Sequence, residues 1–346
     1  MNKIIVEDAK TVADAAINWS IFENRTVLIA GATGYVPQNF VHALLQRNDG
    51  YGSRIKVLAL CRNKGRAQAR FGEYMGRTDF HLILQDVREP VDYEGDIDFI
   101  IDAAGPAAQK ERGLYSEIFL ANVDGCHNLL ELARSKEAVL LFVSSVDVYG
   151  HLPEPIRSQE SVSGSLDPLE PRNVYACAKR AAETLCLCYK EAGVDCRIAR
   201  PVMILGGGVA LDDGRMHIDL ISQMLAKKKI SLTGDGTPRR SFLYVTDAVT
   251  GMLTILAEGT AGEAYNLSWE ENEASVLELA QLMSRLADAE IGVEYDLSHR
   301  QDPAVTKAVN QVVSDSAKLR KLGWQAKYSL REAVRRMMAY YGACRI

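Results

Sequence analysis

The chain has 346 residues, of which 47% are apolar and 25% charged, and its net charge is −5. These values are ordinary for a globular protein, and the length allows one large domain or two modest ones. An acidic balance without a basic stripe argues against a nucleic-acid partner. No run of about 18 or more apolar residues occurs, so we expect no membrane-spanning helix.

The first residues and the cysteines indicate which cellular compartment to expect. Glu7 and Asp8 come too early for a secretory signal. The seven cysteines are odd in number and lack the paired spacing of a metal site. We therefore expect reduced thiols, a cytoplasmic location and no bound metal.

Residues 1–24 are predicted to form an N-terminal helical extension, and residues 26–30 a buried parallel strand. The glycine turn at residues 31–36 follows, and then apolar residues recur at helical spacing. Strand, glycine turn and helix together are the context of a dinucleotide phosphate site, although an ordinary strand–helix turn looks similar. Pro37 stands where such a fingerprint has its third glycine. The residues expected at the phosphates are Gly31, Thr33, Gly34, Tyr35 and Val36.

A second strand, at residues 55–60, ends without the acidic residue that binds the ribose 2′-hydroxyl of NAD. Arg62 follows it, with Lys64 and Arg66 nearby. These side chains suit a 2′-phosphate or an adenine face, which favours NADP over NAD. Basic loop residues are also often simply solvated, so both cofactors stay open.

Three more short apolar strands are predicted, at residues 81–87, 97–102 and 139–143. The small residues Ala103, Ala104 and Gly105 after the second of them would let a cofactor lie close to the backbone. The third delivers residues 144–150 to a carboxyl-terminal sheet edge, where open α/β sheets bind ligands. We expect a helix to start at Asn122, and Ser145 and Asp147 to share one side of a strand-like segment.

Tyr175 and Lys179 lie four residues apart in an alanine-rich, strongly helical stretch, so they share one helix face. A free tyrosine has a pKa of about 10 and is a poor base at neutral pH. A nearby ammonium favours the phenolate, so we expect Lys179 to lower the pKa of Tyr175. The same spacing is also common on surface helices, so it indicates a catalytic pair only together with the other motifs of the chain.

In order and spacing, these segments resemble the extended short-chain dehydrogenase/reductase family, in its nucleotide-sugar epimerase/dehydratase branch. The resemblance covers about residues 25–340 and includes relatives of UDP-glucuronate decarboxylase and dTDP-glucose 4,6-dehydratase. A shorter match, Asp212-Asp213-Gly214-Arg215, is similar to a decarboxylase segment that precedes a substrate-domain helix, although it also reads as a simple turn. Further matching segments are Arg200-Pro201, Gly234-Asp235-Gly236, residues 240–247 and Leu322-Gly323-Trp324.

The resemblance implies a Rossmann-type α/β fold, a doubly wound parallel sheet with a smaller carboxyl-terminal substrate-binding domain. Residues 25–200 and 241–258 would bind NAD or NADP, and residues 201–240 and 259–346 would bind a nucleotide-diphosphate sugar. The helix with Tyr175 would join a homodimer interface. Implied cofactor contacts are the phosphate-turn residues above, Arg62, Asp86, Val87, Ala103, Ala104, Gly105, Asn122, Tyr175 and Lys179; implied substrate contacts are Ser145, Asn173, Arg215 and Arg240.

The implied chemistry is transient oxidation of the sugar at C4, giving a 4-keto sugar. Tyr175 would take the hydroxyl proton, Lys179 would support it and hold the nicotinamide ribose, and Ser145 would shuttle the proton. Asp147 stands where dehydrating or decarboxylating relatives carry a carboxylate, so it is the fourth catalytic candidate, although it could instead cap a turn. We therefore predict decarboxylation or dehydration after the oxidation.

Several departures from the family pattern keep alternatives open. Val146 replaces the acid that protonates a leaving hydroxyl in many dehydratases, and Met203 and Leu205 replace the usual Asn and Tyr. A 4-epimerase or an NADPH-dependent 4-keto-sugar reductase is the alternative enzyme. A non-catalytic sensor of NAD(P) or nucleotide sugars is the alternative of another class, although a sensor needs no proton relay.

Overall fold

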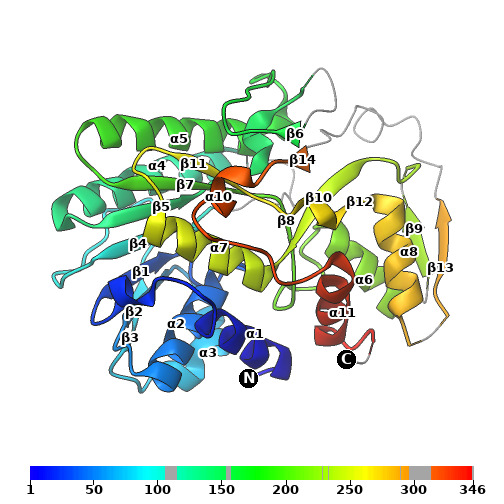
Figure 1. Cartoon of the computed structure of the whole chain (residues 1–346), viewed down its shortest axis with the longest axis horizontal. Helices are drawn as coiled ribbons and strands as arrows, with labels where there is room; N and C mark the ends of the chain where they lie inside the picture. Colours follow the sequence, from blue (N-terminus) through cyan, green and yellow to red (C-terminus); the bar gives the residue numbers. More distant parts are fainter. Residues whose placement is uncertain are drawn as a thin grey trace.

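The computed structural model describes residues 1–105, 115–152, 157–227, 229–232, 234–288, 290–295 and 313–344. Seven strands form one sheet in the order β11-β7-β5-β4-β1-β2-β3, and all six neighbouring pairs are parallel (Figure 1). The strands are β1 Thr26–Ala30, β2 Lys56–Cys61, β3 Phe80–Leu84, β4 Phe99–Asp102, β5 Val139–Val143, β7 Cys196–Pro201 and β11 Ala264–Leu267. The predicted Rossmann-type sheet is confirmed.

Helices cover both faces of this sheet, which is why its strands are apolar on both sides (Figure 1). Alternate strand residues separate the two layers: Ile29 packs with α2 and α7, and Leu28 packs with α4 and α5. The chain order reverses between β1 and β4, so their carboxyl ends frame the crevice in which such sheets bind ligands. The covering helices are α2 Pro37–Tyr51, α3 Lys64–Phe71, α4 Tyr115–Lys136, α5 Val174–Glu191 and α7 Val245–Glu258.

A smaller region lies beyond the carboxyl ends of the strands and contains three short sheets (Figure 1). Their strand orders are β12-β10-β8, β13-β9 and β14-β6. Its helices are α6 Met216–Lys227, α8 Val276–Leu286, α10 Ala317–Arg320 and α11 Leu330–Tyr340. Its strands are β6 Arg157–Ser158, β8 Met203–Leu205, β9 Lys229–Leu232, β10 Arg239–Tyr244, β12 Glu273–Ser275, β13 Gly292–Tyr295 and β14 Val313–Ser314.

Strand β11 differs from the sequence-based assignment. We expected residues 259–346 to belong to the substrate region, yet β11 pairs with β7 at the edge of the large sheet. The large sheet therefore extends beyond residue 258. The remaining domain boundaries stay a prediction.

The N-terminal extension begins with α1 Lys3–Ala13 and continues with a 3₁₀ turn, Trp19–Phe22. Asn2 caps α1, because its Oδ1 accepts a hydrogen bond from the Ile4 N–H at 2.8 Å. Its apolar residues are buried, and α1 lies against α2 near the carboxyl-terminal helix α11 (Figure 1). Across the described ranges, no helix is both long and apolar enough to cross a membrane.

Candidate active site

A cavity of ≈ 870 Å³ opens at the carboxyl ends of β1, β2 and β4, beside the point where the strand order reverses. Eleven residues predicted from the sequence to bind cofactor or substrate line it. These are Gly31, Thr33, Gly34, Tyr35, Arg62, Asp86, Val87, Ala103, Ala104, Gly105 and Arg215. The strands thus bring together residues that are far apart in the sequence.

The phosphate turn after β1 depends on close backbone packing. Gly31 has a φ of +70°, and a Cβ there would lie 2.8 Å from the Ala103 carbonyl oxygen. A side chain at this position would therefore be strained and crowded. Pro37 is the first residue of α2, a position where its missing N–H costs no hydrogen bond. The helix accordingly starts without the third glycine of the fingerprint.

Arginines line the side of the cavity near β2. Arg62, Arg66 and Arg70 all contribute to the wall, and Arg62 lies 3.7 Å from the Asp86 carboxylate. Arg70 was missed by the sequence analysis, although its position four residues after Arg66 on α3 places both on one helix face. It donates a hydrogen bond to the Gly208 carbonyl at 2.9 Å. This side of the cavity, where a cofactor ribose would lie, thus carries three guanidiniums and the Asp86 carboxylate.

Residues 208–215 form another part of the wall, although the sequence analysis assigned them only to the substrate region. Tyr341 holds this segment, because its hydroxyl donates to the Val209 carbonyl at 2.8 Å. Arg215 lies 3.3 Å from the Asp213 carboxylate, and its guanidinium carbon is 5.2 Å from the centre of the Tyr35 ring. Further cavity residues missed from the sequence are Leu60, Cys61, Asn63, Gln85, Glu117, Ile118, Ala121, Gly208, Val209 and Ala210.

The Tyr175 and Lys179 side chains lie on the first turns of α5 and face the end of β5. Lys179 Nζ donates to the Val143 carbonyl at 2.7 Å and lies 5.8 Å from the centre of the Tyr175 ring. Burial raises the pKa of Tyr175 above its usual value, and the Asp147 charge adds to this. Ser145 and Arg215 oppose the rise. The expected lowering of the Tyr175 pKa is therefore absent from the structure of the protein alone, because burial and Asp147 outweigh Ser145 and Arg215.

Ser145 and Asp147 do not lie on a strand, so that expectation was wrong. Ser145 follows β5 and caps a 3₁₀ turn, Val146–Tyr149, by accepting the Asp147 N–H at 3.1 Å. Asp147 has an exposed surface, yet protein surrounds it closely enough for desolvation to raise the pKa of its carboxyl. The charge of Arg240 and the Ser145 hydroxyl oppose this rise. The turn thus brings the carboxyl of Asp147 into the electrostatic reach of Tyr175 and Arg240.

Arg239 and Arg240 point to opposite faces of β10, as neighbouring strand residues do. Arg239 forms an ion pair with Glu278 at 3.0 Å. Arg240 is half-buried and interacts electrostatically with Asp147. This arrangement favours Arg240 over Arg239 as the residue that faces the site.

Three other predicted contacts lie outside the cavity wall. Asn122 lies inside α4 rather than at its start, because that helix begins at Tyr115, so the expected helix start was wrong. Its Nδ2 donates to the Ile118 carbonyl at 2.7 Å, and its amide leaves no room for a Cβ at Gly105. Asn173 precedes α5 and donates to the Asp167 carbonyl at 2.9 Å. Val36 precedes α2.

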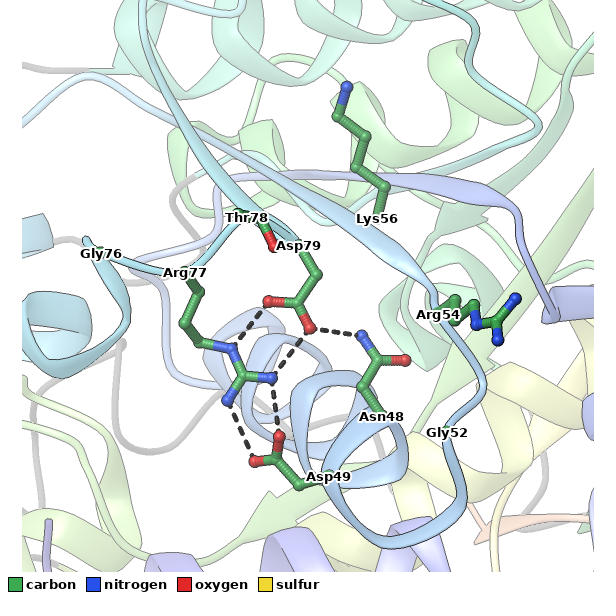
Figure 2. Close-up of a pocket in the computed structure, with 9 residues that line it drawn as sticks. All are labelled: Asn48, Asp49, Gly52, Arg54, Lys56, Gly76, Arg77, Thr78 and Asp79. Atoms are coloured by element: carbon green, nitrogen blue, oxygen red, sulfur yellow. Dashed lines mark hydrogen bonds and ion pairs between the residues drawn. The ribbon is translucent and has the colours of Figure 1, made fainter.

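A second hollow, of ≈ 810 Å³, lies at the opposite edge, near the amino ends of β2 and β3. Figure 2 shows Arg77 fixed between two carboxylates, at 2.7 Å from Asp49 and 2.8 Å from Asp79. The same Asp79 carboxylate accepts a hydrogen bond from Asn48 at 2.8 Å. These groups bind one another, so this hollow is a structural ion-pair cluster and not the reaction site.

Comparison with known proteins identifies the family of the chain. The model of the NAD dependent epimerase/dehydratase family matches residues 27–268. The chain belongs to this family. The predicted resemblance is thereby confirmed.

Individual relatives of this family agree along nearly the whole chain. UDP-glucuronic acid decarboxylase 1 of Arabidopsis thaliana is 31% identical over 321 residues, 90% of this chain and 69% of the relative. The structure of dTDP-glucose 4,6-dehydratase from Bacillus anthracis, in complex with NAD, superposes with a TM-score of 0.75 at 22% identity, covering 92% and 96% of the two chains. UDP-glucuronic acid 4-epimerase from Bacillus cereus gives 0.73 at 20% identity, covering 91% and 98%.

Proposed function

We propose that this protein oxidises C4 of a nucleotide-diphosphate sugar transiently with NAD(P) and then decarboxylates or dehydrates the sugar, decarboxylation being favoured. One observation carries the proposal. Ser145, Asp147 and Arg215 all act electrostatically on the buried Tyr175 phenol, and Lys179 Nζ lies 5.8 Å from the centre of its ring. A nucleotide sensor would not need this convergence of a phenol, a hydroxyl, a carboxyl and two cations.

The cavity fits a dinucleotide by the chemistry of its wall. The phosphate turn brings backbone close to the helix α2 N-terminus, which favours negative charge. Arg62, Arg66 and Arg70 would bind the adenosine ribose and, in NADP, its 2′-phosphate. These arginines favour NADP, whereas the matching family model is described as NAD dependent. When bound, the oxidised cofactor supplies a hydride acceptor and a positive charge.

Tyr175 would remove the proton from the C4 hydroxyl, and Ser145 would hydrogen-bond the same oxygen. The phenol must lose its proton although burial raises its pKa. The Lys179 ammonium and the Arg215 guanidinium are the cations near enough to favour the phenolate. Lys179 would also hold the nicotinamide ribose.

Decarboxylation is favoured by the relatives and by Arg215. UDP-glucuronic acid decarboxylases are similar to this chain at 31% identity. Arg215 acts electrostatically on Tyr175, and one of its guanidinium nitrogens, Nη1, is buried with no hydrogen-bond partner among the described residues. A guanidinium with a free N–H beside the reacting hydroxyl suits a sugar carboxylate. Val146, packed against the core, replaces an acid that dehydration would use.

Substrate binding would involve residues from both regions of the protein. Arg240 would face the diphosphate, and Asn173 would contact the sugar beside Tyr175. With residues 25–200 and 241–258 as the cofactor domain, extended by β11, the remaining carboxyl-terminal residues would close over the sugar nucleotide. The protein would work in the cytoplasm.

The alternative enzyme is a 4-epimerase or an NADPH-dependent 4-keto-sugar reductase. The arginine wall that favours NADP is the observation behind the reductase. A non-catalytic sensor is the alternative outside catalysis, and the departures that motivate it are Pro37, Val146, Met203 and Leu205.

Product mass separates these possibilities. Purified protein is incubated with UDP-glucuronate and with UDP-, dTDP-, GDP- and CDP-hexoses, each with NAD⁺, NADP⁺ or NADPH. We expect UDP-glucuronate to give a product lighter by one CO₂. A product lighter by one water means dehydration, an isobaric product means epimerisation, and consumption of NADPH with an added UDP-4-keto-hexose means reduction. Tyr175→Phe should abolish turnover and keep cofactor binding; if its turnover is unchanged, the assigned base is wrong.

A further inference from the structure

Asp102 is a buried carboxyl that the chemistry above does not use. It ends β4, is 1% exposed, and lies directly before the small residues that line the cofactor cavity. Its Oδ1 accepts the Ala104 N–H at 3.2 Å. Its Oδ2 is buried with no hydrogen-bond partner among the described residues. An ionised carboxylate in such a place requires a compensating charge.

The strand register places Asp102 beside Lys179. Asp102 pairs with Phe142 on the neighbouring strand β5. Lys179 Nζ lies 4.6 Å from the centre of that Phe142 ring and donates to the next carbonyl, Val143. Neighbouring strands are about 4.8 Å apart, so the Asp102 carboxyl, at the end of β4, lies beside the end of β5, where the Lys179 ammonium is bound. The lysine is itself only 4% exposed.

The other acid near Lys179 is already neutralised. Glu183 forms an ion pair with Arg200 at 2.7 Å and accepts a second hydrogen bond from the same guanidinium at 2.9 Å. Ser144 donates to Glu183 as well, at 2.6 Å. Asp102 has no such cation among the described residues besides Lys179.

The thiols around the lysine are not counter-charges either. Cys126 on α4 and Cys186 on α5 are buried, with their sulfurs 4.0 Å apart. A hydrogen bond to Cys186 lowers the pKa of the Cys126 thiol, but burial and Asp102 outweigh it and leave that pKa raised. Hydrogen bonds to Cys126 and Cys196, together with burial, raise the pKa of Cys186. Both thiols are therefore neutral at physiological pH.

We propose that Asp102 is the counter-ion that keeps Lys179 protonated, and that it thereby acts as a positioning residue for the Tyr175–Lys179 pair; this role rests on the proposed function. Burial lowers the pKa of Lys179, and Asp102 is the largest opposing influence. Burial raises the pKa of Asp102 to about 6, against the attraction of Lys179. Above pH 6 the carboxylate therefore stabilises the ammonium, and below it this support is lost. The titratable groups packed around the pair are Cys126 from α4, Tyr175, Glu183 and Cys186 from α5, and Cys196 from β7.

The lysine can be observed directly in the full-length protein, without turnover. Protein labelled with ¹³C at lysine Cε is titrated by NMR, and Lys179→Met assigns the signal. We expect the wild-type Lys179 signal to show a step near pH 6, where Asp102 ionises, and then its own midpoint. In Asp102→Asn the step should vanish and the Lys179 midpoint should fall by about one pH unit or more.

Asp96→Asn is the matched control, because it removes the same charge from an exposed residue just before β4. It should leave both features unchanged. The proposal is overturned if the Lys179 midpoint in Asp102→Asn equals that of the wild type, or if the wild-type signal has no step near pH 6. The titration of Lys179 in the wild type tests the proposal even if Asp102→Asn fails to fold. If the protein is active, Asp102→Asn should also move the alkaline limb of the kcat–pH profile to lower pH and leave KM unchanged. If the protein is inactive but Lys179 titrates as expected, only the proposed function is refuted.

Discussion

At the scale of single residues, Asp147 is the side chain whose chemistry separates the possible reactions. It is exposed, unlike the buried Lys179, and interacts electrostatically with both Arg240 and Tyr175. Its raised pKa makes it a better proton acceptor or donor near neutral pH than an ordinary aspartate. A ketone at C4 acidifies the neighbouring C–H bonds, so a second acid/base group beside it decides what happens next.

Asp147→Asn should block decarboxylation or dehydration and leave oxidation at C4. We expect product formation to fall by about 100-fold or more, the lower range for loss of a general acid/base. Reduced dinucleotide should accumulate, which absorbance and product mass together detect. Asp92→Asn, which removes a charge from an exposed loop residue, should change neither. Unimpaired product formation by Asp147→Asn would show that another group does this work.

The sequence predicted which residues form the site better than it predicted their pKa values. Ser145, Tyr175 and Lys179 were predicted as a group, and the structure brings them together. The pKa of Tyr175 was predicted in the wrong direction, because burial depends on packing that no local pattern encodes. Arg70 was missed because it comes to the cavity only through the fold of α3.

At the scale of elements, the N-terminal helix α1 is fixed by a buried ionic cluster. Asp8 is 1% exposed, accepts the Tyr244 hydroxyl at 2.8 Å and pairs with Arg336 of α11 at 2.7 Å. Arg336 also lies 3.2 Å from Glu7. Burial raises the pKa of the Asp8 carboxyl, against the pull of Arg336. One guanidinium therefore links the first helix of the chain to the last.

Arg336→Met should destabilise the protein by about 3 kcal/mol at pH 8, because it leaves a buried carboxylate without its cation. An acid whose folded pKa is raised contributes stability below its unfolded pKa and loses it as pH rises through the folded value. The destabilisation caused by Arg336→Met should therefore be smaller at pH 5 than at pH 8, as measured by urea unfolding at both pH values. Lys3→Met, at a side chain that is 86% exposed, should change stability little. An equal loss at both pH values would contradict this account of Asp8.

Element prediction succeeded where the chain is buried on both faces. The strands at Thr26–Ala30 and Val139–Val143 match the predicted ranges, since buried parallel strands are continuous apolar runs. The segment after Ser145 was predicted as strand-like, but the Ser145 cap turns it into a 3₁₀ turn. The pairing of β11 with β7 is a long-range contact that local periodicity does not reveal.

At the scale of the whole molecule, we propose a homodimer that forms through α4 and α5. These two helices pack against each other on one face of the large sheet (Figure 1). Large apolar side chains remain exposed on both of them: Leu187 is 52% exposed on α5, and Leu120 is 40% exposed on α4. A second copy would bury them.

Leu187→Glu should weaken this dimer, because it would bury an unpaired charge in an apolar interface. We expect the wild type to sediment as a dimer. The variant should dissociate at protein concentrations about tenfold or more above those at which the wild type dissociates. Leu225→Glu, at a residue that is 41% exposed on α6, should leave the dimer intact. A wild type that is monomeric at all concentrations would refute the proposal.

Deuterium transfer from C4 shows whether the enzyme oxidises the sugar at that carbon. Asp147→Asn is incubated with UDP-glucuronate deuterated at C4. The bound dinucleotide is then recovered, and its mass is measured by mass spectrometry. The account predicts reduced dinucleotide that carries the deuterium, and wild-type product that has regained it at C4. Reduced dinucleotide without deuterium, or a wild type that converts the sugar with no deuterium ever leaving C4, would contradict oxidation at that carbon.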